Sequence, residues 1–141
     1  MKYILLVALT ISFGTFAEKI SFDEMLKYAG DGCVECQYQI GRFYDDGEGV
    51  PKNDMLAVKW YRKAAHQGHA GSQIYLGLKY VNGEGISENI IRGYAWWSIA
   101  KAQGEGEKLI ESLKENMTKD QIAQAQELAA KCYGSKYKDC D

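Results

Sequence analysis

The sequence predicts an all-α protein built from repeated helix pairs. Three observations support this class: a gap-free 36-residue repeat, apolar residues at helical spacing in each unit, and glycines at fixed positions. A period of between about 20 and 50 residues is typical of repeat architectures. The residues that recur one period later include Gly41 and Gly77, Gly47 and Gly83, Gly49 and Gly85, Trp60 and Trp96, and Gly68 and Gly104.

The composition excludes several other classes. Hydrophobic residues make up 46% of the chain and aromatic residues 12%, which is enough for a core and excludes a disordered chain. Glycine occurs 15 times without a three-residue period and proline occurs once, which excludes a collagen-like chain. The 141 residues suit one domain, and the formal net charge of −2 gives no basic footprint for a nucleic acid partner.

The first 17 residues have the layout of a secretory signal peptide. A positive start at Lys2 is followed by an apolar run over residues 3–16 and by a small-x-small site that ends at Ala17. The apolar run is shorter than the roughly 20 residues that span a membrane. We therefore expect cleavage near Ala17, a mature single domain over 18–141 without a membrane span, and a periplasmic or secreted location where cysteines oxidise.

Residues 21–32 predict a capping half repeat at the start of this domain. Ser21 and Glu24 form a capping box, which opens a short helix that reaches about Tyr28. Gly32 lies one period before Gly68, so the half repeat keeps the register of the repeats that follow.

Residues 33–68 and 69–104 predict two full repeats of two helices each. In the first repeat, Gly47 is expected to end the first helix, Asn53 to cap the second helix and Gly68 to stop it. The predicted apolar faces of the two helices are Cys36, Ile40, Phe43 and Tyr44, and then Ala57, Trp60, Tyr61, Ala64 and Ala65.

Two glycines fall inside the predicted first helices, where glycine costs about 1 kcal/mol relative to alanine. We expect Gly41 and Gly77 to permit a close helix approach in which a side chain would collide with the ring of Trp60 or Trp96.

Residues 105–132 predict two C-terminal capping helices, and residues 133–141 form a tail. The first of these helices falls within about 106–116, and a capping box at Thr118 and Gln121 opens the second. Neither helix matches the repeat, as expected of a terminal cap.

The stretches over residues 40–50 and 57–68 resemble the Sel-like repeat (SLR) family, a branch of the tetratricopeptide superfamily. The resemblance covers about residues 32–131. It implies a right-handed α-solenoid, an α/α superhelix of SLR/TPR-like helix pairs, whose members mostly serve as adaptors for other proteins.

The four cysteines allow three disulfide pairings. Cys33 and Cys36 lie at a helix start, where a redox pair is conceivable, but the βαβ context of a thioredoxin-like site is absent and a structural disulfide is favoured. The spacing of Cys132 and Cys140 resembles a staple of the cysteine-rich secreted members of the family. The preferred pairing is therefore 33–36 with 132–140.

A second stripe on the first helices predicts the partner-binding groove. Ile74, Leu78 and Val81 lie at i, i+4 and i+7, away from the face that serves the core. The equivalent residues of the first repeat are Tyr38, Arg42 and Asp45. First helices line the concave side of tetratricopeptide-like solenoids, so the stripe faces the groove and could hold a peptide or helix of another protein. The alternative is that the C-terminal cap packs over the apolar half of this stripe.

No cofactor or metal site is expected. His66 and His69 are the only histidines, no further ligands cluster beside them, and both are expected to be exposed turn residues.

The predicted function is that of an exported module for protein–protein interaction: an adaptor, a regulator or an inhibitor that neutralises a toxin. The alternative is a weak β-lactam-binding or β-lactamase-type enzyme of the cysteine-rich SLR kind. Ser98 with Lys101 and Ser135 with Lys138 fit the serine-x-x-lysine element of such enzymes, but the serine-aspartate-asparagine and lysine-threonine-glycine elements do not occur. No catalytic residue is therefore assigned.

Overall fold

The computed structural model describes residues 20–140, and the regular structure in this range is helical, without a strand. The predicted signal peptide lies outside the described residues. No helix within the described range is long and apolar enough to cross a membrane. The helices are α2 (Phe22–Gly30), α3 (Val34–Asp46), α4 (Asp54–Ala65), α5 (Ala70–Asn82), α6 (Ile90–Lys101), α7 (Glu107–Lys114) and α8 (Lys119–Gly134).

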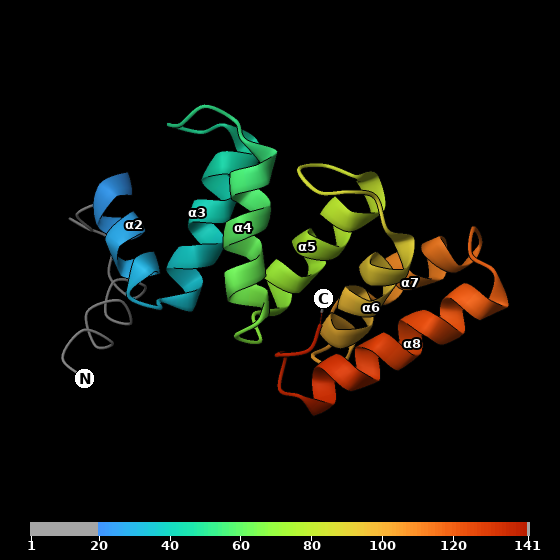
Figure 1. The fold of residues 1–141 in the computed structure, drawn as a ribbon. Helices are drawn as coiled ribbons and strands as arrows, with labels where there is room; N and C mark the ends of the chain where they lie inside the picture. Colours follow the sequence, from blue (N-terminus) through green and yellow to red (C-terminus); the bar gives the residue numbers. More distant parts are fainter. Residues whose placement is uncertain (1–19, 141) are drawn as a thin grey trace.

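The helices follow one another in chain order from α2 at one end to α7 and α8 at the other (Figure 1). Helix α3 pairs with α4 and α5 pairs with α6, while α4 also packs against α5 and so stacks the second repeat on the first. Helix α2 covers α3 at one end, and α7 and α8 cover α6 at the other. This arrangement is the predicted all-α solenoid of helix pairs with terminal capping helices.

The predicted signals set the helix boundaries. Ser21 and Thr118 form capping boxes at the starts of α2 and α8. Gly47 and Gly83 end α3 and α5 in the left-handed conformation, with φ of 71° and 68°, which glycine adopts without a steric penalty. The side chains that cap α4 and α6 belong to Asn53 and Asn89.

Two glycines allow the paired helices to approach closely, but the rings involved differ from those expected. A Cβ atom at Gly41 would lie 2.7 Å from the ring of Tyr61, and one at Gly77 would lie 2.5 Å from the ring of Trp97. Adjacent residues of a helix point about 100° apart, so only one of two neighbouring aromatic residues can face the glycine. The expected rings, Trp60 and Trp96, each lie one residue earlier in the chain.

A buried glutamine ladder connects each first helix to the helix before it. Gln37 donates to the carbonyl oxygen of Ala29 at 2.9 Å, and Gln73 donates to that of Ala65 at 3.2 Å. These bonds satisfy carbonyl groups near helix ends that would otherwise be buried without a partner. The oxygens of the two buried amides accept hydrogen bonds from Gln67 and Gln103.

The main apolar cluster joins both repeats to the C-terminal tail. It contains Tyr61 and Trp96 of the second helices together with Cys132 and Cys140, which form a disulfide. The tail therefore closes back onto the repeats, and Tyr137 lies against Gly68 in the turn after α4. The other disulfide joins Cys33 to Cys36, so both pairs are those preferred from the sequence.

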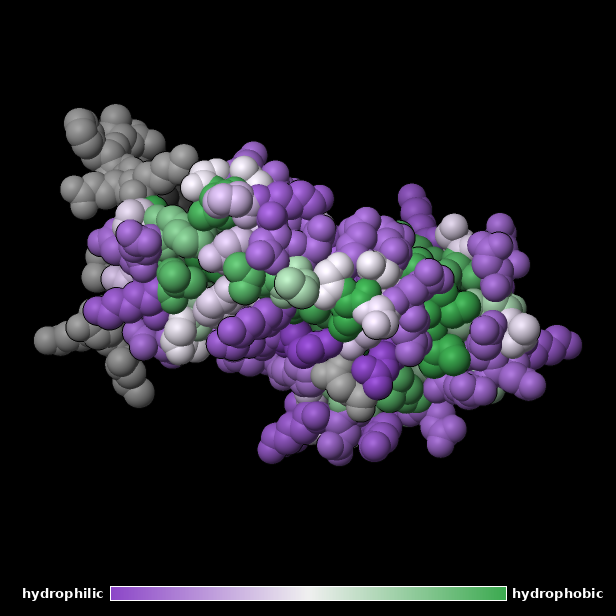
Figure 2. Space-filling view, turned by 45° about the horizontal axis from the view of Figure 1, so that its top comes forward, coloured by the Kyte–Doolittle hydropathy of each residue, from purple (hydrophilic) through white to green (hydrophobic). Residues whose placement is uncertain are grey.

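Apolar side chains reach the surface at several places along the molecule. In the space-filling view, a mostly hydrophilic exterior is interrupted by apolar patches at the α2 end, over the middle and at the end of the capping helices (Figure 2). A short solenoid has to cover its first and last repeats with helices of this kind.

We predict that Gly77→Ala destabilises the protein by about 1–3 kcal/mol, because the new methyl group overpacks the contact with Trp97. Gly30→Ala is the matched control, since a Cβ there meets nothing within 4 Å and alanine is the better helix former. Urea unfolding followed by circular dichroism measures both. Equal stability of the two variants would contradict the close-approach explanation.

Candidate functional site

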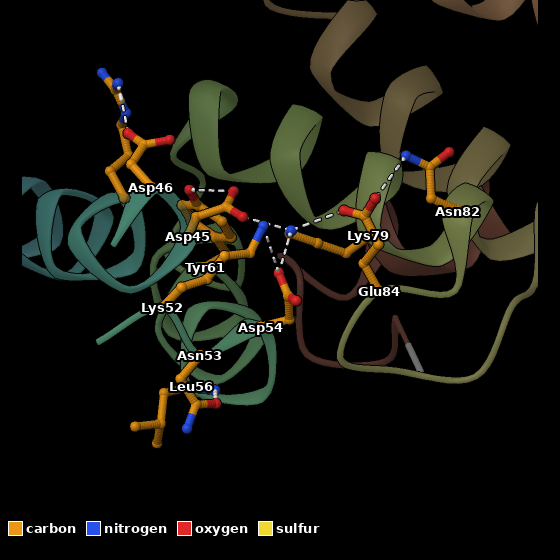
Figure 3. A network of polar contacts seen from close by, with 11 residues as sticks. Asp45, Asp46, Lys52, Asn53, Asp54, Leu56, Tyr61, Lys79, Asn82 and Glu84 are labelled. Carbon is orange, nitrogen blue, oxygen red and sulfur yellow. Dashed lines mark hydrogen bonds and ion pairs between the residues drawn. The ribbon is translucent and has the colours of Figure 1, made fainter. Parts of the chain in front are cut away.

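A buried lysine joins the two repeats. The side chain of Lys79 on α5 is 3% exposed, and its ammonium nitrogen lies 2.9 Å from a carboxylate oxygen of Asp54 and 2.9 Å from one of Glu84. It also donates to Asp45 at the end of α3. The cluster thus draws the end of α3, the start of α4 and the loop after α5 around one positive charge (Figure 3). We call these four residues the Lys79 cluster.

The charges of the cluster stabilise one another. Burial by itself would lower the pKa of Lys79, but hydrogen bonds to Asp45, Glu84 and Asp54 raise it above its ordinary value. The hydrogen bond from Lys79 lowers the pKa of Asp54 and of Glu84. A buried cation of this kind is tolerated because it is paired and hydrogen-bonded.

Tyr61 ties the cluster to the aromatic core. Its hydroxyl donates to Asp45 at 3.1 Å, and burial together with the nearby Asp45 carboxylate raises its pKa. Asp45 was expected to line the groove, but its side chain is only 14% exposed and serves Lys79 and Tyr61. It can therefore position the groove, while other side chains provide its surface.

The first helices present a group of aromatic and charged side chains that we call the tyrosine patch: Tyr38, Arg42, His69 and Tyr75. The rings of Tyr38 and Tyr75 are half-buried and lie 6.0 Å apart, and Tyr38 lies 4.6 Å from the ring of His69. The side chain of Arg42 is 44% exposed and binds Asp46 at 3.0 Å. Burial and the nearby Tyr75 raise the pKa of Tyr38, while Arg42 opposes the shift.

The two histidines differ from the exposed turn residues that we expected. His69 caps α5 by accepting the backbone N–H of Ser72, and its other ring nitrogen lies 3.3 Å from Glu35 on α3. His66 contacts the backbone oxygen of Tyr137 in the tail. Both therefore connect elements, and the described residues hold no group of three or more side chains suited to a metal ion.

The apolar half of the predicted groove is partly covered. Ile74, Leu78 and Val81 pack with residues of α6, α7 and α8 in a second apolar cluster. Space is so limited that a Cβ at Gly106 would lie 2.8 Å from Ile74 and one at Gly93 would lie 2.5 Å from Val81. The structure thus supports the alternative in which the C-terminal cap packs over this stripe. In this structure the three residues are partly buried and contact the cap, so their role as partner contacts stays a prediction.

The serine-x-x-lysine elements do not form nucleophile–base pairs. Lys101 binds Glu107 at 2.9 Å. The hydroxyl of Ser135 donates to the carbonyl oxygen of Cys132 and accepts the backbone N–H of Lys138. Ser135 therefore closes the turn after α8, and neither element gives support to β-lactam chemistry.

The sequence analysis did not single out two residues of the candidate site. Lys79 replaces Phe43, and Tyr75 replaces Gln39, at equivalent positions of the two repeats. The sequence did hold a signal for them, because both positions depart from the repeat pattern on a first helix. A position whose residue type differs between the two repeats cannot make the same packing contact in both.

Comparison with known proteins identifies the repeat. The chain matches the Sel1 repeat family over residues 34–69 and 70–105, one residue later than the boundaries expected. Over 48 residues it is 40% identical to a chitin synthase regulator, SKT5, of Saccharomyces cerevisiae, which corresponds to 34% of this chain and 7% of that protein.

Solved structures share the architecture. A protective antigen present in uropathogenic Escherichia coli strains, which displays an SLR fold, superposes with a TM-score of 0.78 at 29% identity over 82% of this chain and 25% of that chain. A Sel1 repeat protein from Oxalobacter formigenes superposes with a TM-score of 0.60 at 32% identity over 64% of this chain and 68% of its own. The chain thus spans only a small part of the antigen and of the yeast regulator.

We predict that Lys79→Met lowers the free energy of unfolding at pH 7 by roughly 3 kcal/mol, near the lower end of the cost of removing one partner from a buried ion pair. Asp54 and Glu84 are partly exposed and can regain water. Lys114→Met, which removes an exposed ion pair with Glu111, is the matched control and should leave the stability nearly unchanged.

The loss of stability in Lys79→Met should also depend on pH. The lowered pKa values of Asp54 and Glu84 add stability that is complete above their unfolded values of about 4 and is lost as the pH falls through the folded values. The stability difference between wild type and Lys79→Met should therefore shrink from about pH 5 towards pH 3. A difference that stays constant over this range, in urea unfolding at each pH, would count against the ion cluster.

Proposed function

Because the chain belongs to the Sel1 repeat family, we propose that it is an exported module that binds another protein through its tyrosine patch. Sel1 repeat proteins generally mediate protein–protein interactions. The roles consistent with this proposal are those of an adaptor, a regulator or an inhibitor that neutralises a toxin in the periplasm or outside the cell.

The observation that carries the proposal is the half-open face of the first helices. The C-terminal cap packs on the second repeat's stripe, whereas Tyr38, Tyr75 and Arg42 lie outside that apolar cluster, the tyrosines half-buried and the arginine exposed. Tyrosine and arginine are enriched among the residues that dominate binding energy at protein interfaces. Rigid aromatic rings also bury a large area for a small loss of side-chain entropy.

The patch is organised before a partner binds. Tyr75 stacks on the buried ring of Tyr61 with centroids 5.1 Å apart, and His69 is fixed between Ser72 and Glu35. Preorganisation reduces the entropy cost of association. Export is supported by the signal-peptide pattern in residues 1–17 and by two disulfides, which persist in oxidising compartments.

Site-specific photocrosslinking in cells that make the protein tests the binding surface. We expect p-benzoyl-phenylalanine in place of Tyr75 to give one discrete protein adduct, which mass spectrometry identifies. The same group in place of Tyr133, which is 57% exposed on α8, is the control and should not give that adduct. An equal yield from both positions, or no adduct from position 75, would contradict the proposal.

The purified partner then allows a quantitative test. Arg42→Glu should weaken its binding at least about tenfold, because the substitution reverses the charge that the patch presents beside Tyr38. Lys108→Glu on α7 changes the net charge equally and should have little effect. Isothermal titration calorimetry measures both, and a comparable loss in both variants would point to long-range electrostatics instead of the patch.

A further inference from the structure

We propose that the protein has a second binding surface, on the second helix of the first repeat, that takes an acidic segment with interspersed apolar side chains from a partner protein. The surface is a cleft of about 600 Å³ between α4 and the loop that joins α5 to α6. Its lining residues are Met55, Val58, Lys59, Arg62, Lys63, His66, Gly85 and Ile86.

The cleft has an apolar base and a basic edge. Met55 is 69% exposed, Val58 is buried, and Ile86 contributes from the loop. Lys59 and Lys63 follow Met55 at i+4 and i+8, so the three residues form one stripe along α4. An exposed apolar strip beside basic side chains suits a ligand that carries both apolar and negative groups.

Charge complementarity identifies the occupant. The described lining residues include two lysines and an arginine but no carboxylate, although the whole chain has a net charge of −2. A cationic surface on an acidic protein attracts anionic segments locally. The exposed Met55 and the partly buried Ile86 favour a peptide over a purely ionic ligand, because apolar side chains of a peptide can cover their accessible surface.

The walls of the cleft are fixed in advance. Gly85 has φ +71°, and a Cβ there would lie 2.3 Å from the carbonyl carbon of Asp54, so the loop packs directly on the first turn of α4. Glu84 anchors the same loop to Lys79 at 2.9 Å. Arg62 donates to the hydroxyl of Tyr80, and Lys63 lies over the ring of Trp60 at 4.5 Å. Little further ordering is needed to receive a ligand.

The cleft and the tyrosine patch share no residue. The cleft is lined by α4, by His66 just after it and by the loop that joins α5 to α6, whereas the patch belongs to α3 and α5 and to the cap of α5. One protein could therefore hold two segments at once, which would suit an adaptor that brings two chains together.

Fluorescence anisotropy with a labelled 12-residue peptide of alternating glutamate and leucine tests the proposal. We expect saturable binding that weakens as salt increases. Lys59→Glu/Lys63→Glu should weaken it about tenfold or more, and so should Met55→Asp. The matched control Lys108→Glu/Lys119→Glu, with the same change in net charge on α7 and α8, should bind as the wild type does. Circular dichroism confirms that each variant is folded.

Three results would overturn the proposal. They are the absence of binding, an equal loss in the control variant, and equal affinity for a peptide of glutamate and serine, which would show that the apolar base is not used. Amide chemical shifts in two-dimensional NMR should change over residues 55–66 and 84–86 on titration. Binding by Arg42→Glu should be unaffected, which keeps this test separate from that of the tyrosine patch.

Discussion

The buried ammonium group of Lys79 is the interaction on which the relation between the two repeats depends. Its carboxylate partners come from the end of α3, the start of α4 and the loop after α5, so one side chain sets three chain segments relative to one another. Asp45 extends the effect through Tyr61 to the tyrosine patch, and Glu84 extends it to the loop that walls the basic cleft. Both candidate surfaces therefore rest on the same charge.

The repeat architecture could be predicted from the sequence because its signals are local. Capping boxes at Ser21 and Thr118 and left-handed glycines at Gly47 and Gly83 act within a few residues of the helix ends that they define. Because the sequence repeats every 36 residues, most of these signals occur twice and support each other. Which of two adjacent aromatic residues faces the glycine could not be predicted from these signals, because periodicity alone does not fix the rotation of a helix to within one residue. In the structure Tyr61 and Trp97 contact the glycines, and the neighbouring tryptophans do not.

The site was harder to predict, since it depends on contacts between distant parts of the chain. Lys79 finds Asp45 and Asp54 at sequence separations of 34 and 25 residues. Whether the stripe of Ile74, Leu78 and Val81 is open depends on α7 and α8, which lie outside the repeat and follow no register. Two positions that break the repeat, Lys79 and Tyr75, carry the buried ion cluster and part of the tyrosine patch.

The central claim is that the Lys79 cluster makes the two repeats one cooperative unit, which presents a preformed face to a partner. Native-state hydrogen exchange of wild type and Lys79→Met, followed amide by amide, tests this claim most directly. In the wild type, the amides of α3 to α6 that exchange most slowly should all have the same free energy of opening. In Lys79→Met, the amides of α3 and α4 should open at a distinctly lower free energy than those of α6. A uniform decrease across all four helices, or no change, would contradict it.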